Sequence, residues 1–228
     1  MISQEFLRQL DERIAKYDLL SHPFYQAWSK GELTREDIRE YAGDYYHHVR
    51  AFPTYLAELA IRLEDGELRQ TVLRNLADEK GSHDDSAHDQ IWLQFAEAFG
   101  ARHTAAHKPS AGVAQLMEFF HRIAAEGSPR EALAAFYAYE SQVPRLAAEK
   151  ERGLKAFYNA DEAATLYFTL HKTADVEHAE SWRRELAKQI EAQPDSSEAA
   201  LDAAEQAALS LWKALDSIES ARLQKQAA

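Results

Sequence analysis

Three segments of the chain carry side chains that bind metal ions. The most specific is residues 170–178, LHKTADVEH, in which His171, Asp175 and His178 stand at positions i, i+4 and i+7. On a continuous helix these three side chains lie within about 60° of one another. Two imidazoles and one carboxylate on a single stripe are donors suited to iron, manganese or zinc. The alternative is a solvated polar face whose spacing is coincidental.

The second segment surrounds Glu140, which lies among Phe136, Tyr137, Tyr139 and Val143. A carboxylate in such apolar surroundings is costly to bury unless a cation or a metal ion pairs with it. The segment therefore predicts either a buried ligand or, as the alternative, a glutamate on the exposed side of its helix.

The third segment is dense in ligand types. Glu79 and His83 form one i,i+4 pair, and Asp84 and His88 form another. Glu79 and His88 are nine residues apart, which puts them on opposite sides of an unbroken helix. They converge only if the chain breaks near Gly81. A polar helix junction without a ligand role is the alternative.

Helices of an antiparallel bundle can aim such segments at one interior point, which is how carboxylate-bridged two-metal sites are built. Three carboxylates and three imidazoles offset most of the charge of two divalent ions and leave positions open for dioxygen or substrate. The chain has no cysteine, so thiolate metal sites, iron–sulfur clusters and disulfides are excluded.

The elements that must position these groups are helices. Apolar residues recur at helical spacing, and only 8 Gly and 6 Pro interrupt 228 residues. The pattern predicts a single all-α bundle domain over residues 1–228, with a helix bent at Pro53 and a frayed tail from about 220 to 228. Helices are expected over residues 6–17, 24–29, 34 to beyond 53, 67–80, 84–99, 111–125, 129–152, 161–193 and 197–220.

The charge balance narrows the function classes. With 38 Asp+Glu against 26 Lys+Arg, the net charge is −12, which argues against a nucleic-acid partner because phosphate contacts need a basic face. No apolar run approaches the roughly 18 residues of a membrane span. The first twenty residues are charged throughout, unlike a secretory signal. A cytoplasmic protein without a membrane partner is expected.

Aromatic residues crowd the N-terminal quarter, where Tyr25 and Tyr45 stand out because a phenol close to an oxidising metal can itself be oxidised. Plain packing is the alternative for each. Four stretches together resemble the haem-oxygenase-like di-metal oxidases, in the subgroup related to the Chlamydia protein associating with death domains. They are HPFYQAW (22–28), GELTREDIREYAGDYYHHVRAFPTYL (31–56), YESQVPRLAAEKERGL (139–154) and HKTADVEHA (171–179).

The resemblance covers most of the chain to about Leu215 and implies a compact haem-oxygenase/TenA-like bundle of about seven helices. It also implies two divalent ions, Fe/Fe or Fe/Mn, with dioxygen and an external reductant as co-substrates. The ligands that it implies are Glu79, His88, Glu140, His171, Asp175 and His178. The family spacing of the first pair is seven residues rather than nine, so His83 or Asp84 could replace a ligand there.

The subgroup makes para-aminobenzoate for folate from one of its own tyrosines. By motif, Tyr25 would supply the carbon skeleton, Tyr45 would assist, Lys150 would donate the amine and Tyr167 would line the site. The resemblance also allows a homodimer. Two other functions stay open: a di-metal oxygenase acting over many turnovers on a small external amine or acid, and a metal-free helical binding or regulatory protein.

Overall fold

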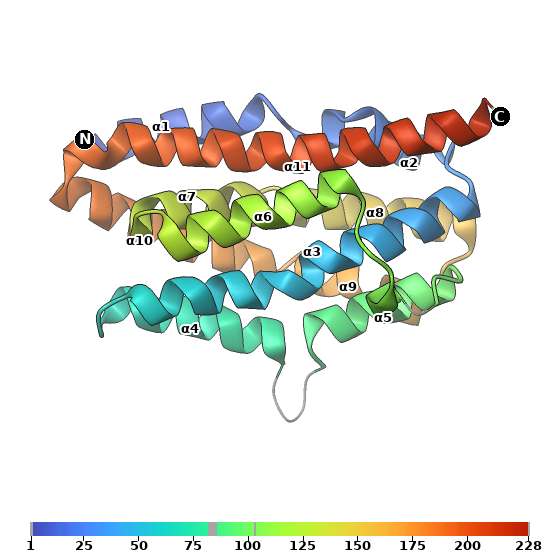
Figure 1. The fold of residues 1–228 in the computed structure, drawn as a ribbon, viewed down its shortest axis with the longest axis horizontal. Helices are drawn as coiled ribbons and strands as arrows, with labels where there is room; N and C mark the ends of the chain where they lie inside the picture. The colour runs from blue at the N-terminus through green and yellow to red at the C-terminus, as the bar shows by residue number, and fades with distance from the viewer. Residues whose placement is uncertain (1, 82–85, 103, 228) are drawn as a thin grey trace.

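The chain is built from helices throughout the part described by the computed structural model, residues 2–81, 86–102 and 104–227 (Figure 1). Short 3₁₀ turns lie at Leu19–Ser21, Thr104–Ala106 and Pro194–Ser196. The α-helices are α1 (Ile2–Ala15), α2 (Pro23–Lys30), α3 (Arg35–Arg62), α4 (Glu67–Lys80), α5 (His88–Ala98), α6 (Ala111–Glu126), α7 (Pro129–Glu140), α8 (Val143–Tyr158), α9 (Glu162–His171), α10 (Ala174–Ala192) and α11 (Ser197–Gln226).

The all-α prediction is confirmed for the described residues, but the expected number of about seven helices is wrong. Eleven α-helical segments are present there, or nine if α7–α8 and α9–α10 are each counted as one interrupted helix. The difference arises from short helices such as α2 and from the break between α4 and α5. Both interrupted helices carry candidate ligands next to the interruption, so the breaks matter for the site.

The long C-terminal helix α11 forms one edge of the bundle and lies beside α1, with α6 and α7 also packed against it (Figure 1). Its inward face is lined by small residues such as Ala204, Ala207 and Ala208, which are fully buried. The facing side of α7 is equally small, with Ala134, Ala135 and others buried. Small side chains let two helices approach closely, which explains how so alanine-rich a chain forms a dense core.

Helix α3 crosses the bundle and packs against α4, α5 and α6. A capping box between Thr34 and Asp37 fixes its start, and it continues through Pro53 to Arg62. Tyr41 and Tyr45 lie one turn apart on its buried face. Since these two tyrosines share one helix face, α3 orients both toward the same interior region.

Two predicted boundaries differ from the structure. Helix α5 begins at His88 rather than near residue 84, since Ser86 and Ala87 are not helical. Helix α11 continues to Gln226, beyond the predicted fraying point near residue 220. Ion pairs of Arg222 with Glu219 and of Lys225 with Glu40 hold its last turns.

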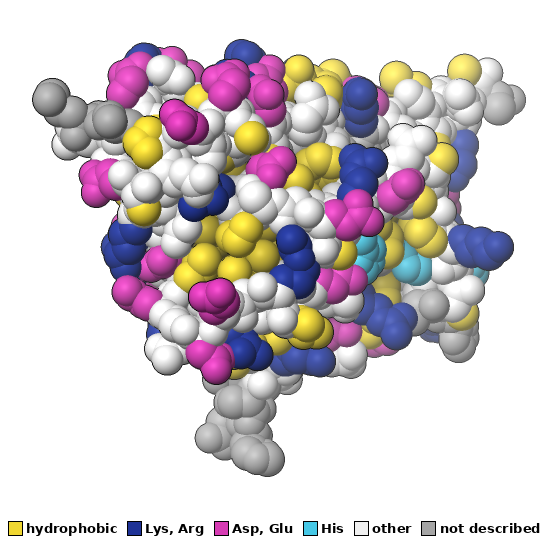
Figure 2. Space-filling model, turned by 60° about the vertical axis from the view of Figure 1, so that its left-hand side comes forward, with side chains coloured by type: hydrophobic (Ala, Val, Ile, Leu, Met, Phe, Trp, Pro, Cys, Tyr) yellow, Lys and Arg dark blue, Asp and Glu magenta, His cyan; other side chains and the backbone are white. Residues whose placement is uncertain are grey.

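The surface carries charges of both signs. On the face shown in Figure 2, acidic and basic side chains are interspersed and do not gather into one basic patch. None of the helices in the described part of the chain is both long and apolar enough to cross a lipid bilayer.

Candidate active site

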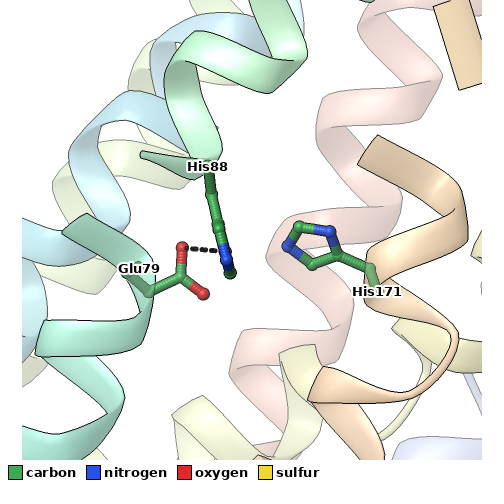
Figure 3. A group of neighbouring side chains, drawn as sticks. All are labelled: Glu79, His88 and His171. Carbon is green, nitrogen blue, oxygen red and sulfur yellow. Dashed lines mark ion pairs between the residues drawn. The ribbon is translucent and has the colours of Figure 1, made fainter. Parts of the chain in front are cut away.

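Glu79 and His88 meet at the junction between α4 and α5. Gly81 ends α4 with a φ of +70°, in the region that favours glycine, and α5 starts at His88. The predicted break near Gly81 is therefore confirmed, and it brings Nδ1 of His88 to 2.9 Å from Oε2 of Glu79 (Figure 3). His83 and Asp84, the two alternative ligands, lie outside the described residues.

Glu140 is the last residue of α7 and is 1% exposed, which excludes a position on the exposed helix side. The predicted continuous helix over 129–152 is wrong, because α7 ends here and α8 starts at Val143. The reason is Pro144, which has no N–H and whose ring clashes with the carbonyl group four residues earlier, that of Glu140. Helix α7 is buried along residues 132–140, so Glu140 lies at the buried end of an interior helix.

The predicted continuous helix over 161–193 is also interrupted. Helix α9 ends at His171, and α10 begins at Ala174, after Lys172 and Thr173. His171 faces Glu79 and His88, and its ring lies 4.5 Å from that of His88, centroid to centroid (Figure 3). Asp175 and His178 face Glu140 instead. The His-x-x-x-Asp-x-x-His stripe thus serves two neighbouring groups rather than one.

These six side chains form two overlapping groups with the geometry of metal sites, in which the offered ligand atoms all lie within 4.8 Å of one another. All six are buried, although they come from five different helices. Glu79 belongs to both groups, as a bridging carboxylate would. The first group is Glu79, His88 and His171, and the second is Glu79, Glu140, Asp175 and His178.

Residues other than these six hold two of the candidate ligands, Glu140 and His171, through hydrogen bonds. Asn75 donates to Oε1 of Glu140 over 3.0 Å, and the indole N–H of Trp182 donates to Oε2 of the same residue. Nδ1 of His171 donates to the backbone carbonyl of Tyr167 over 2.7 Å, which leaves Nε2 free to face the first group. Such outer contacts orient metal ligands in known sites.

The second group fits a cation. Oδ1 of Asp175 and Nδ1 of His178 lie 3.5 Å apart and have no hydrogen-bond partner among the described residues. Burial, followed by the charges of Glu140 and Glu79, raises the pKa of Asp175 to about 7. Burial lowers the pKa of His178, but Asp175 and Glu140 outweigh burial and raise it to about 11. Protons therefore compensate the carboxylates when no metal ion does so.

Beside the metal-type groups lies a buried aromatic chamber that contains Lys150. Its Nζ donates to the hydroxyl group of Tyr41 over 2.6 Å, and that hydroxyl lies 2.9 Å from the hydroxyl of Tyr25. The same Nζ lies 4.7 Å from the centroid of the Tyr25 ring. The amine is therefore held above the ring of one tyrosine by the hydroxyl of another.

Burial lowers the pKa of Lys150 to about 7, since the side chain is only 7% exposed and has no carboxylate partner among the described residues. The free space beside it is about 20 Å³, bordered by Tyr25, Tyr45 and Tyr167 among others. This is room for about one water molecule. The chamber therefore provides an amine that is mainly neutral above about pH 7, with no space for an aromatic ring from outside.

A chain of ring contacts joins the chamber to the candidate ligand His171. Tyr167 stacks on His171 with centroids 3.8 Å apart, and it also contacts Trp92 at 4.8 Å. Trp92 lies 5.7 Å from Tyr45, which in turn stacks on Tyr41 at 5.4 Å. All of these rings are buried. Tyr45 and Tyr167 therefore lie between the Tyr25–Lys150 pair and the ligand cluster.

Sequence reasoning missed four residues of this site. Tyr41 bridges Tyr25 and Lys150, Trp92 joins the two halves of the ring chain, and Asn75 and Trp182 hold Glu140. One signal was available: Asn75 precedes Glu79 by four residues and so shares its helix face. The roles of Tyr41 and Trp92 depend on helix rotation and on contacts far along the chain, which spacing does not reveal.

Comparison with known proteins supplies the family. Residues 39–212 match the family model described as "iron-containing redox enzyme". The chain belongs to this family. A relative from Chlamydia muridarum named 4-aminobenzoate synthase is 41% identical over 221 residues, which cover 95% of this chain and 91% of the relative.

A second family relative, from Nitrosomonas europaea and also named 4-aminobenzoate synthase, is 36% identical over 96% of this chain and 92% of its own length. Among solved structures, a protein of unknown function with a haem oxygenase-like fold from Shewanella denitrificans superposes with a TM-score of 0.79. That match covers 96% of this chain and 94% of the other at 19% identity. The predicted haem-oxygenase-like fold is thus confirmed.

Proposed function

We propose that the chain is an oxygen-dependent di-metal 4-aminobenzoate synthase that takes the carbon skeleton of its product from its own Tyr25 and the nitrogen from Lys150. The observation that carries this proposal is the position of Nζ of Lys150, 4.7 Å from the centroid of the Tyr25 ring inside a buried chamber. The names of the two relatives support 4-aminobenzoate as the product. The contacts of the chamber support Tyr25 and Lys150 as its sources.

Six residues would hold two ions, iron with iron or iron with manganese. Glu79, His88 and His171 offer one glutamate and two imidazoles, and Glu140, Asp175 and His178 offer two further carboxylates and one imidazole. When bound, such ions supply dioxygen activation and one-electron oxidation. The outer contacts from Asn75 and Trp182 keep Glu140 oriented for this purpose.

The proposed conversion can be written bond by bond. The Cα–Cβ bond of Tyr25 breaks and leaves a hydrogen on Cα, and the Cε–Nζ bond of Lys150 breaks and leaves Cε as an aldehyde. A bond from the ring to Nζ replaces the bond from the ring to the phenolic oxygen, which leaves as water, and Cβ is oxidised to a carboxylate. Two dioxygen molecules are the oxidant and supply the oxygen atoms of the carboxylate and the aldehyde, while an external reductant supplies two electrons and two protons, with which the remaining oxygen atom leaves as a second water. Each chain can react only once, since both residues are consumed.

The neighbouring side chains have distinct roles in this scheme. Lys150 acts as a nucleophile only when it is neutral, and burial provides that form near neutral pH. Tyr41 holds the amine and accepts its hydrogen bond while contacting the hydroxyl of Tyr25. Tyr45, Trp92 and Tyr167 form the route by which an electron leaves the chamber toward His171.

A second candidate function has one observation in its favour. A hollow of about 470 Å³ borders His88 and His178, is lined also by Asp78, Leu166 and Glu177 among others, and shares no lining residue with the chamber. A small external amine or acid has room there, as oxidation over many turnovers would require. The aromatic chamber, by contrast, has room for about one water molecule.

The test loads the purified protein with iron and manganese, adds dioxygen and a chemical reductant, and measures 4-aminobenzoate by mass spectrometry together with the intact mass of the chain. We expect no more than about one product per chain and a matching mass loss at Tyr25 and Lys150. Protein grown on ring-labelled tyrosine should give labelled product. Many turnovers with an intact chain would support the second candidate.

Two variants separate the remaining alternatives. Tyr25→Phe should bind metal normally but make no product, and normal yield would remove Tyr25 from the scheme. The double change of His171 and His178 to Ala should abolish metal binding, so retained metal would contradict the ligand assignment. Elemental analysis of the wild type without metal above background would favour a metal-free binding or regulatory protein.

A further inference from the structure

The carboxylate of Asp78 contacts the candidate ligand His178 from outside the metal cluster. Asp78 lies near the end of α4, and its Oδ2 is 3.1 Å from Nε2 of His178. The other ring nitrogen, Nδ1, points inward and lies 3.4 Å from Oε1 of Glu140 and 3.5 Å from Oδ1 of Asp175. One imidazole is thus placed between an outer carboxylate and two inner ones.

Because of this placement, the tautomer of His178 decides whether its inward nitrogen, Nδ1, can bind a metal ion. A neutral imidazole carries one N–H, and only the nitrogen without it can bind a metal ion. If Asp78 accepts the Nε2–H, then Nδ1 presents its lone pair to the inner cluster. Without Asp78, the inner carboxylates of Glu140 and Asp175 would draw the N–H to Nδ1, and the ring would become a donor where a ligand is needed.

We propose that Asp78 is a positioning residue of the metal centre, which holds His178 in the Nε2–H tautomer and thereby keeps Nδ1 available as a ligand. The proposal rests on the metal centre of the proposed function and adds a residue outside its ligand set. The other outer contacts are buried, but the side chain of Asp78 is 62% exposed. It can therefore be replaced with little effect on the core.

Glu177 provides a matched control. It lies on α10, lines the same hollow as Asp78 and has the same charge. Its carboxylate makes no hydrogen bond or ion pair with any residue in the described ranges 2–81, 86–102 and 104–227. A general effect of negative charge on cation binding would therefore appear in Glu177→Gln as well as in Asp78→Asn.

The experiment titrates metal-free protein with Mn²⁺ alone and follows free Mn²⁺ by electron paramagnetic resonance, for Asp78→Ala, Asp78→Asn and Glu177→Gln beside the wild type. Removing an outer partner of a ligand typically weakens binding about 10- to 100-fold, which is the expected loss at one of two sites in Asp78→Ala. Asp78→Asn should be intermediate, because its amide oxygen still accepts the hydrogen bond. Glu177→Gln should stay within about threefold of the wild type.

A second readout reports the tautomer directly. With Zn²⁺ as a diamagnetic probe, ¹H–¹⁵N NMR of labelled histidine should show a protonated Nε2 for His178 in the wild type and in Glu177→Gln, and loss of that signal in Asp78→Ala. Unchanged Mn²⁺ affinity in Asp78→Ala, or equal losses in Asp78→Asn and Glu177→Gln, would overturn the role of Asp78 alone. A wild type that binds no Mn²⁺ would overturn the metal centre and this inference together.

Discussion

Replacing Lys150 with methionine tests whether the chamber holds a neutral amine. Methionine has a similar length, carries no charge and suits an apolar cavity. Burial lowers the pKa of Lys150 from 10.5 to about 7, a difference that corresponds to about 5 kcal/mol of unfavourable free energy when the folded protein holds the charged amine. The variant removes that cost, so we expect it to be more stable than the wild type in mild acid.

The expected gain in stability follows from this pKa difference and from one contact that methionine cannot make. The pKa difference already contains the attraction of the charged amine to the rings of Tyr25 and Tyr41, with centroids 4.7 and 5.0 Å away, so that attraction makes no separate contribution. The hydrogen bond of the amine to the Tyr41 hydroxyl is worth about 1 kcal/mol and is lost in the variant. Lys150→Met should therefore raise the free energy of unfolding by about 4 kcal/mol near pH 6, where both the folded and the unfolded wild type carry the charge.

The stability advantage of the variant then shrinks as pH rises. Between about pH 7 and 10.5 the unfolded chain binds one more proton at Lys150 than the folded chain does, so the wild type gains stability as pH rises. That gain is fully present above the unfolded pKa and is lost as pH falls through the folded pKa. Near pH 10 the variant should have lost about 4 kcal/mol of its relative advantage and be about as stable as the wild type.

Urea unfolding of metal-free protein at several pH values, followed by circular dichroism, measures this difference. Lys155→Met, on the same helix but with an exposed side chain, controls for the loss of one positive charge. A constant difference between Lys150→Met and the wild type from about pH 6 to 10 would show that Lys150 stays charged in the chamber. That result would refute the neutral-amine argument and, with it, the nucleophilic role of Lys150.

Three further predictions concern the surroundings of the amine. Tyr41→Phe removes the hydroxyl that joins Lys150 to Tyr25, so product yield should fall at least about tenfold while metal content, measured by elemental analysis, stays unchanged. Trp92→Phe, which keeps an aromatic ring but not the indole, should slow oxidation of the chamber without changing Mn²⁺ affinity, as measured by stopped-flow absorbance after mixing with dioxygen. Gly153→Ala puts a methyl group 2.8 Å from Cδ1 of the Trp28 indole, and the overpacking should cost about 1–3 kcal/mol in urea unfolding; unchanged stability would show that the indole can shift.

The fold could be predicted from sequence because helical periodicity is a local property. Most predicted helices lie within a few residues of the observed ones, and the break at Gly81 followed from its residue type. The break before Pro144 was readable only in part, since a proline removes a helix hydrogen bond and clashes with the carbonyl group four residues earlier, yet α3 continues through Pro53. The break at Lys172 and Thr173 was not, because both residues are tolerated in a helix.

The ligand types in the site were visible in the sequence, but their grouping was not. His171 and His178 lie on one predicted stripe, yet they face different groups because of the two residues between α9 and α10. In the same way, Tyr41 and Tyr45 are equivalent by spacing on α3. Only the packing of α8 against α9 and of α2 against α8 decides which hydroxyl meets Lys150.

The two halves of the site have opposite electrostatic requirements, and this opposition explains their arrangement. The ligand cluster concentrates carboxylates that need a cation, and Asp175 and His178 take up protons in its place. The chamber around Lys150 contains phenols whose pKa burial raises, such as those of Tyr41 and Tyr45, so none provides a counter-ion. A carboxylate moved from one half to the other would charge the amine and end its nucleophilicity. The rings of Tyr167, Trp92 and Tyr45 separate the halves while keeping them in contact, so in the proposed reaction an electron would pass through these rings although no ionised side chain lies between the halves.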